Sequence, residues 1–114
     1  MADDDEAIVD STILMLEMMG YETRFTLDGA VMEKAIAFKP NLILLDIWMS
    51  GIDGRDICRS LKADQATRAI PVLMISASRE NRDSALTCGA SDFMEKPFEM
   101  DALVAKIEQL TGTS

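Results

Sequence analysis

Asn41-Leu42-Ile43-Leu44-Leu45-Asp46 is the stretch of this sequence that decides the fold. Its four consecutive large apolar residues are typical of a strand buried on both faces, as in the interior of a parallel sheet. The run ends on a carboxylate, and the glycines that follow indicate a loop. An aspartate at the carboxyl end of a central strand either starts a turn or lies where open α/β sheets bind their ligands. The rest of the chain has to distinguish these two interpretations.

The length and composition of the chain restrict the class of protein to which it can belong. A length of 114 residues predicts one domain, residues 1–114, with enough apolar sequence for a core of its own. Acidic residues outnumber basic ones by 20 to 11, which argues against direct binding to nucleic-acid phosphates and favours solubility. The sequence contains no histidine, so no chemistry can use a histidine base, ligand or phosphocarrier from this chain.

The cysteines and the hydropathy of the sequence indicate the cellular compartment of the protein. Cys58 and Cys88 show no metal-binding or redox spacing and fall in helical patterns, so we expect buried, reduced thiols. There is no signal-peptide pattern and no apolar run long enough to cross a membrane. We therefore expect a cytoplasmic protein that does not bind membranes.

Helical and strand patterns alternate along the chain. Helical periodicity predicts helices over residues 6–19, 30–38, 53–63, 79–88 and 99–110. Strand patterns cover residues 21–27, 42–46, 70–76 and 92–96, with a turn at Asp28-Gly29. This alternation predicts an α/β fold, a doubly wound parallel sheet flanked by helices.

Polar residues stand at the end of successive predicted strands. Asp46, Ser76 and Lys96 each end a strand, and Asp3 and Asp4 precede the first helix. In a doubly wound sheet these positions gather at one edge. Crowded carboxylates repel unless a cation lies between them, and Mg²⁺ suits a site with one or two carboxylates and waters. Acid cluster, metal, lysine and hydroxyl together indicate a site for a phosphoryl group.

With these residues in place, the chain resembles the receiver domain of two-component response regulators, of the chemotaxis-regulator type. The resemblance covers the whole chain in order and implies a flavodoxin-like sheet of strand order 2-1-3-4-5. The matching motifs are Asp3-Asp4-Asp5, Leu44-Leu45-Asp46-Ile47-Trp48-Met49 with Gly51 and Asp53-Gly54, Pro71-Val72-Leu73-Met74-Ile75-Ser76-Ala77, Gly89-Ala90-Ser91-Asp92 and Lys96-Pro97-Phe98.

The resemblance implies a phospho-acceptor and a metal site. Asp46 would take a phosphoryl group from a partner histidine kinase or phosphotransfer protein, or from a small phosphodonor. Mg²⁺ would be bound by Asp4, Asp46 and the backbone carbonyl of Trp48, with Asp3 assisting through a water. Such a domain is a regulatory phospho-acceptor rather than an enzyme.

The same resemblance implies the parts of a switch. Lys96 would pair with Asp46 or the phosphate, and a cis peptide before Pro97 would aim it into the site. Ser76 would hydrogen-bond a phosphoryl oxygen in the active state, while Phe93, the family's aromatic switch position, moves inward.

Two residues near Asp46 depart from the usual pattern. Ser50 stands where the family commonly has proline, so the loop is expected to be less rigid. Trp48 is bulkier than most residues at a position that affects access to the acyl phosphate.

The first strand is the most serious departure. The family has about five hydrophobic residues before the acidic pair, and here only Met1 and Ala2 are present. Burial of five such residues contributes roughly 8–15 kcal/mol, at about 1.5–3 kcal/mol each, which is comparable to the stability of a whole domain, about 5–15 kcal/mol. The second strand could pair directly with the third, a second chain could fill or cover the gap, or the protein in the cell could begin upstream of Met1. We favour the last as the origin of the short first strand.

For the chain as printed, we expect an altered first-strand region and self-association through the exposed sheet. Asp3 and Asp4 would hang from a frayed terminus and bind Mg²⁺ weakly.

Three classes of function are known for a sheet of this topology. A phosphorylatable signalling switch leads, and the alternative is a phosphorylation-independent interaction module with an impaired site. A flavin-binding protein of this topology is a distant third, because it needs a Ser-, Thr- and Gly-rich loop where this chain has Asp3-Asp4-Asp5.

Overall fold

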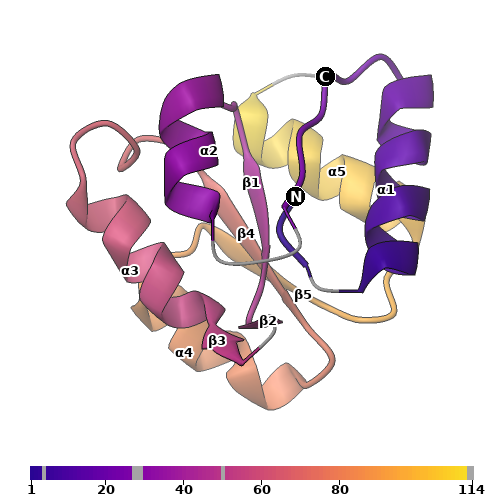
Figure 1. Ribbon diagram of the computed structural model, residues 1–114. Coiled ribbons are helices and arrows are strands. Elements are labelled where there is room, and N and C mark those ends of the chain that lie inside the picture. The colour runs from indigo at the N-terminus through magenta and orange to yellow at the C-terminus, as the bar shows by residue number, and fades with distance from the viewer. Residues whose placement is uncertain (4, 27–29, 50, 113–114) are drawn as a thin grey trace.

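The computed structural model describes residues 1–3, 5–26, 30–49 and 51–112, and shows an open parallel sheet between two layers of helices (Figure 1). Three strands lie parallel in the order β1-β4-β5. They are β1 Ile43–Asp46, β4 Val72–Ser76 and β5 Asp92–Glu95. Every residue of β1 and β4 is buried, as expected for strands whose two faces are both covered.

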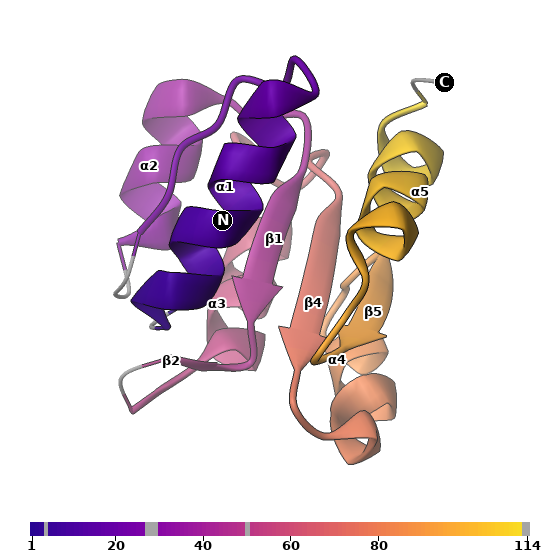
Figure 2. The same cartoon turned by 90° about the vertical axis from the view of Figure 1, so that its right-hand side faces the viewer.

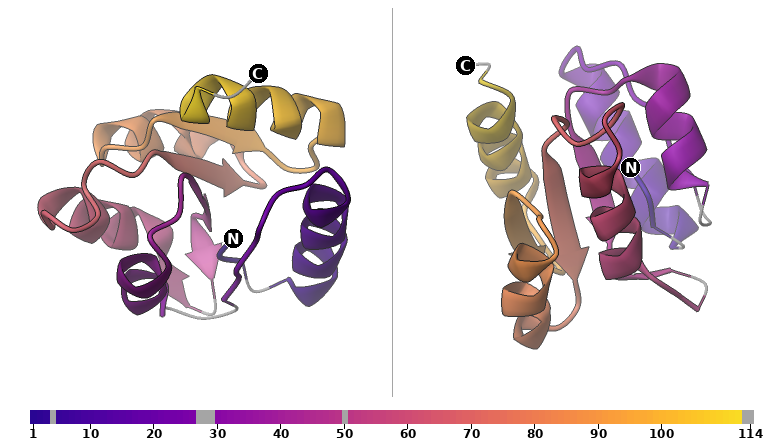
Figure 3. Two further views of the ribbon diagram at one scale, coloured as in Figure 1. Left: turned by 90° about the horizontal axis from the view of Figure 1, so that it is seen from above. Right: turned by 90° about the vertical axis from the view of Figure 1, so that its left-hand side faces the viewer.

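Helices cover both faces of this sheet. The helices α1 Glu6–Met18 and α5 Met100–Thr111 lie on one face, which is turned to the viewer in Figure 2. The other face carries α2 Val31–Phe38, α3 Gly54–Ala63 and α4 Arg82–Thr87, the last preceded by the short 3₁₀ helix η1 Arg79–Asn81. The view from above in Figure 3 shows the three layers. Buried residues accordingly form two clusters, one on each side of the sheet.

Local sequence explains where the first two helices begin and end. The Asp5 carboxylate accepts hydrogen bonds from the backbone N–H groups of Ala7 and Ile8, which caps α1. After the helix the chain reverses at Gly20, whose φ of +94° suits a residue without a side chain. The helix α2 ends where Lys39 adopts a left-handed conformation directly before Pro40.

The first strand is represented by Met1 and Ala2, and these residues keep the central place of a complete strand. The Ala2 N–H donates to the Leu44 carbonyl at 2.7 Å, and the Ala2 carbonyl accepts from the Asp46 N–H at 2.8 Å. On the opposite side, the Thr26 N–H donates to the Met1 carbonyl at 3.0 Å. The order is therefore residue 26, residue 2, β1, β4, β5, which confirms the predicted order 2-1-3-4-5. The possibility that the second strand pairs directly with the third is wrong.

The predicted strand over residues 21–27 is also wrong over its described part. Residues 21–26 form no regular strand, and only Thr26 makes a β-bridge. The physical reason is the length of the partner, because a two-residue strand offers hydrogen bonds to very few residues beside it. Leu27 and the predicted turn at Asp28-Gly29 lie outside the described residues.

Two further differences concern the loops. The segment after β1 contains a small antiparallel hairpin, β2 Trp48–Met49 with β3 Ile52–Asp53, which the sequence did not predict. The predicted helix over residues 79–88 forms as η1 followed by α4, and the Ser78 hydroxyl caps its first turn by accepting from the Glu80 N–H. The remaining helices and strands differ from their predicted bounds only at their ends.

The cysteines behave as predicted. Cys58 and Cys88 are buried free thiols on the helix side that includes α3, and burial raises the pKa of Cys58 to about 12. No helix in the described part of the chain is both long and apolar enough to cross a membrane.

Candidate functional site

Asp46, Lys96 and Asp3 meet at the carboxyl edge of the sheet. Lys96 Nζ lies 2.5 Å from Asp3 Oδ2 and 3.3 Å from Asp46 Oδ2. Asp3 is fully buried and Asp46 is 6% exposed, so the ammonium bridges two carboxylates that water barely reaches. Two negative charges on one positive charge leave the cluster with a net charge of −1 when all three groups are ionised.

Asp3 is not at a frayed end, contrary to expectation. The hydrogen bonds of Ala2 to β1 fix the residue before it, and the Asp3 N–H donates to the Thr26 carbonyl at 3.3 Å. Its carboxylate Oδ1 also accepts from the Asp5 N–H at 3.0 Å. Two strand residues are therefore enough to hold this carboxylate, because bonds from both sides lock the backbone. Asp4 lies outside the described residues.

The environment of Asp46 disfavours its charge. Burial and the nearby Asp3 carboxylate raise the pKa of Asp46 to about 6, although Lys96 opposes both effects. Burial also acts against the charged form of Lys96, but contact with Asp3 and the charge of Asp46 outweigh it, so the pKa of Lys96 is raised. The ammonium therefore keeps its charge in this site.

Lys96 reaches the cluster from the end of β5. Its backbone N–H donates to the Ser76 carbonyl at 2.7 Å, which ties it to the neighbouring strand. The peptide bond between Lys96 and Pro97 is cis, which confirms the expectation for this position.

Ser76 stands at the end of β4 and is 3% exposed. Its hydroxyl accepts hydrogen bonds from the Ser78 N–H at 3.1 Å and from Asn81 Nδ2 at 2.9 Å. The hydroxyl is thus engaged with the turn that leads into α4. Sequence reasoning did not identify Asn81, because nothing in its local pattern distinguishes it from other polar residues at the start of a helix.

Phe93 lies in the middle of β5 and is 8% exposed. It belongs to the core cluster on the side of α3 and α4, together with Met74 and Ala85. Its ring is therefore already inside the molecule, and the predicted inward movement stays a prediction.

Trp48 is much more exposed than the residues just before it. Its side chain is 54% exposed, whereas Asp46 and Ile47 are buried. The Arg55 guanidinium lies 5.2 Å from the centre of its ring, a cation–π arrangement. Asp53 holds Arg55 in turn through an ion pair at 2.9 Å, and the pKa of Asp53 is lowered by that contact. The indole therefore packs beside the start of α3, and the metal role of the Trp48 carbonyl stays a prediction.

Gly54 is a site-positioning residue at the first position of α3. A Cβ atom placed there would overlap the carbonyl oxygen of Asp46, and the Gly54 N–H donates to the Ile47 carbonyl at 2.5 Å. Only glycine allows the helix to begin so close to the strand end. The sequence motif included this glycine, but the contact that requires it joins residues that only the fold brings together.

The donor set fits a hard divalent cation. Asp3 Oδ2 accepts no hydrogen bond of regular geometry from the described residues, and the charges beside it are the Lys96 ammonium and the Asp46 carboxylate. Oxygen atoms of two buried carboxylates, with a net negative charge, are what Mg²⁺ takes as protein ligands. Within the described residues, no three carboxylate or thiol side chains group closely enough to form a complete protein cage. Such a cage is not needed by an ion that keeps several waters.

Comparison with known proteins gives the same class. Residues 1–108 match the family model described as the response regulator receiver domain. The DNA-binding dual master transcriptional regulator RpaA of Synechocystis is 36% identical over 95% of this chain, and the response regulator PleD of Caulobacter vibrioides is 41% identical over 96%. The chain spans 46% of the first relative and 25% of the second.

Solved structures agree. A putative response regulator from Chloroflexus aurantiacus superimposes with a TM-score of 0.91 at 26% identity, covering 97% of this chain and 93% of that one. The receiver domain of NtrX from Brucella abortus superimposes with a TM-score of 0.87 at 36% identity, covering 99% of this chain and 97% of that one. The fold is that of a receiver domain, and the chain belongs to the response regulator receiver domain family of two-component systems.

Proposed function

We propose that this receiver domain is a phosphoryl-accepting switch in which Asp46 is the acceptor. The observation that supports the proposal best is the cluster at the sheet edge, where Lys96 bridges the buried carboxylates of Asp46 and Asp3. As in other receiver domains, the phosphodonor would be a phosphohistidine on a histidine kinase or phosphotransfer protein; this chain has no histidine that could carry the phosphoryl group itself.

The reaction is a transfer of one phosphoryl group. An Asp46 carboxylate oxygen attacks the phosphorus, the bond from phosphorus to the imidazole nitrogen breaks, and the electron pair stays on the imidazole. The product is an acyl phosphate on Asp46 and a free histidine on the partner.

Each neighbour of Asp46 has a distinct part in this step. Lys96 offsets the negative charge that the phosphoryl group brings. The Ser76 hydroxyl, which now accepts a hydrogen bond from Asn81, would donate its O–H to a phosphoryl oxygen, and this shift of Ser76 would move the turn before α4. Asp46, Asp4 and the Trp48 carbonyl would hold Mg²⁺, with Asp3 assisting through a water, and the ion would supply positive charge to the transferring oxygens.

The phosphorylation-independent module is not favoured. It required the short first strand to dismantle the site, yet Asp3 is buried and paired with Lys96. Self-association through the sheet stays a prediction. The names of several relatives describe DNA-binding regulators, and we assign that property to parts of those proteins other than an acidic domain of this kind.

Incubation with acetyl phosphate and Mg²⁺, followed by intact mass measurement, tests the proposal. We expect the mass of one phosphoryl group to be added to the wild type and none to Asp46→Asn. Removal of Mg²⁺ with EDTA should abolish the addition. Addition to the Asp46→Asn variant, or none to a folded wild type, would refute Asp46 as the acceptor.

A further inference from the structure

Arg55 links the start of α3 to the start of α4. Its guanidinium donates to both carboxylate oxygens of Asp53, from Nε to Oδ1 and from Nη2 to Oδ2, each at 2.9 Å. The remaining nitrogen, Nη1, donates to the Ser84 hydroxyl in the first turn of α4 at 3.0 Å. The Arg55 side chain is only 20% exposed, so this bond lies largely out of water. We call the hydrogen bond between Arg55 and Ser84 the clamp.

The Arg55 end of the clamp is fixed in place. Asp53 holds the guanidinium as a two-pronged ion pair, and its carboxylate also accepts from the Arg55 backbone N–H at 2.9 Å. Asp53 pairs with Trp48 in the hairpin of β2 and β3, and the Trp48 ring lies beside the guanidinium. Arg55 is therefore attached to the hairpin that follows Asp46 and cannot move freely with Ser84.

The Ser84 end of the clamp leads to the hydroxyl of Ser76. While accepting from Arg55, the Ser84 hydroxyl donates to the Asn81 carbonyl at 3.0 Å, because a hydroxyl can accept and donate at once. The Asn81 side chain then donates to the Ser76 hydroxyl at 2.9 Å. A line of contacts through one turn of chain therefore connects Arg55 to Ser76.

This line fixes the turn before α4 in the structure as it stands. In the proposed function, Ser76 donates to a phosphoryl oxygen and shifts together with the turn that it contacts. The start of α3 cannot follow, because Gly54 packs directly on the Asp46 carbonyl. Movement of the turn therefore has to stretch or break the clamp.

We propose that Arg55 is a positioning residue that opposes activation of this receiver. Its bond to Ser84 holds the turn before α4 in the unphosphorylated arrangement, and phosphorylation of Asp46 breaks that bond. This inference rests on the proposed function of Asp46 and adds to it a residue that sets the equilibrium between two conformations. A bond made in only one of two states shifts their equilibrium by its own free energy. A hydrogen bond of ordinary net strength corresponds to about a fivefold change in an equilibrium constant.

Binding of beryllofluoride, a mimic of the phosphoryl group, tests the proposal on the full chain with Mg²⁺ present. Trp48 is the single tryptophan, so its fluorescence follows the titration, and fluorine NMR of the bound mimic gives a second measure. Ser84→Ala removes the acceptor of the clamp and should bind beryllofluoride about fivefold more tightly than the wild type. Without the mimic, the same variant should be less stable in urea. A merely structural defect would weaken binding instead of tightening it.

Three further variants separate the clamp from other effects. Ser84→Thr keeps a hydroxyl and should restore the affinity of the wild type. Thr87→Ala, in the same helix, removes an exposed hydroxyl that donates to the Asp83 carbonyl at 2.8 Å, and should leave the affinity unchanged. Arg55→Lys keeps the positive charge but cannot bridge Asp53 and Ser84 at once, so it should tighten binding as Ser84→Ala does. Combined with Ser84→Ala it should add nothing, because both substitutions remove the same bond.

The outcomes distinguish the clamp from the proposed function. Equal or weaker binding by a folded Ser84→Ala variant, beside normal binding by the wild type, would overturn the clamp and leave Asp46 as the acceptor. Equal tightening in Thr87→Ala would show a general loosening of α4 and would also overturn the clamp. Absence of binding to the folded wild type would overturn the proposed function, and the clamp with it.

Discussion

At the scale of single residues, Asp46 is subject to opposing influences. Burial and the Asp3 carboxylate favour its neutral form, and Lys96 favours its charged form. The first two are stronger, which leaves the pKa at about 6 without a metal ion. A nucleophilic carboxylate must be ionised, so the cluster needs additional positive charge before it reacts.

Replacement of Asp46 by asparagine should alter how stability depends on pH. The folded carboxyl holds its proton more tightly than the unfolded one, so the free energy of unfolding falls as pH rises from about 4 to about 6. A difference of about two between the pKa values corresponds to about 3 kcal/mol. In urea denaturation with EDTA present, the free energy of unfolding of Asp46→Asn should therefore rise by about that much relative to the wild type between pH 4 and pH 7. A difference between the two proteins that does not change with pH would contradict the raised pKa.

Removal of the Lys96 charge should lower the free energy of unfolding. Lys96→Met leaves two buried carboxylates without a cation, and removal of one member of a buried ion pair typically costs about 3–5 kcal/mol. Mg²⁺ should restore part of the loss and stabilise this variant more than the wild type. Lys106→Met, which breaks the more exposed pair with Asp92, should cost less than about 1 kcal/mol. Equal losses in the two variants by urea denaturation would refute the special position of Lys96.

At the scale of elements, the start of α3 and the end of β1 depend on each other. Gly54 allows the helix to begin against the Asp46 carbonyl, and Asp53 caps it by accepting from the Arg55 N–H. The first-strand residues act similarly, because Ala2 fixes both Asp3 and the end of β1. The site is therefore built from the ends of elements, and small changes in those ends reach its side chains.

Gly54→Ala should disturb Asp46 as well as the helix. The added methyl group would overlap the Asp46 carbonyl oxygen, and such overpacking costs about 1–3 kcal/mol. Gly112→Ala is the control, because it meets no atom within 4 Å and only strains a positive φ of 74°. Both variants should lose stability in thermal denaturation, but only Gly54→Ala should slow phosphorylation by acetyl phosphate. An unchanged rate in that variant would contradict the coupling.

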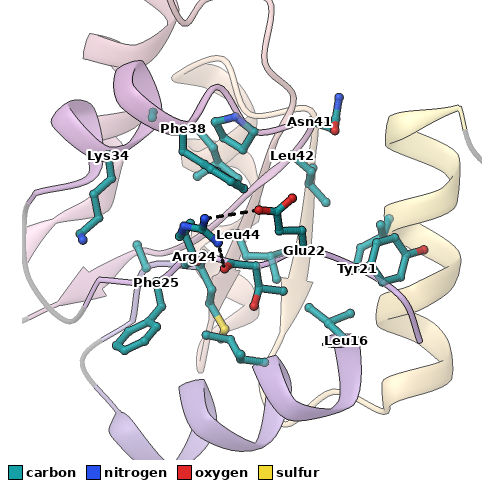
Figure 4. Close-up of a pocket in the computed structure, with 18 of the residues that line it drawn as sticks. Leu16, Tyr21, Glu22, Arg24, Phe25, Lys34, Phe38, Asn41, Leu42 and Leu44 are labelled. Atoms are coloured by element: carbon teal, nitrogen blue, oxygen red, sulfur yellow. Dashed lines mark hydrogen bonds and ion pairs between the residues drawn. The ribbon is translucent and has the colours of Figure 1, made fainter. Parts of the chain in front are cut away.

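Extension of the chain before Met1 should stabilise the fold, because a cavity of about 550 Å³ lies beside the first half of β1 (Figure 4). Joining Val-Ile-Ile-Val to Met1 would bury up to four apolar side chains, an upper limit of roughly 6–12 kcal/mol. We expect a gain of at least about 3 kcal/mol in urea denaturation. A Ser-Asn-Ser-Gly extension of equal length is the control. Equal stability of the two extended chains would show that no strand forms beside β1 in this region.

At the scale of the whole molecule, two helical layers and the parallel sheet bring the carboxyl ends of β1, β4 and β5 to one edge (Figure 1). The alternation of helix and strand predicted this arrangement correctly, because burial of one helix face leaves a periodic pattern in the sequence and burial of both strand faces leaves a continuous apolar run. The strand order 2-1-3-4-5 rested on resemblance, and a single residue, Ala2, preserves it.

The sequence could not predict how the short first strand is accommodated. A strand is recognised by its own pattern, but whether residues 21–26 pair depends on a partner far away in the chain. The burial of Asp3 has the same origin, because its backbone is held by Thr26 and, through Ala2, by β1. Local patterns contain neither piece of information.

The sequence by itself determined the α/β class, the family and the polar residues at the strand ends, because all three are written in short-range periodicity and in motifs. Only the tertiary structure decided that Lys96 lies closer to Asp3 than to Asp46, that Ser76 is engaged by Asn81, and that Ala2 bridges Leu45 and Thr26. Those features depend on distances between segments remote in sequence. Packing of the whole chain fixes such distances, and no local pattern records them.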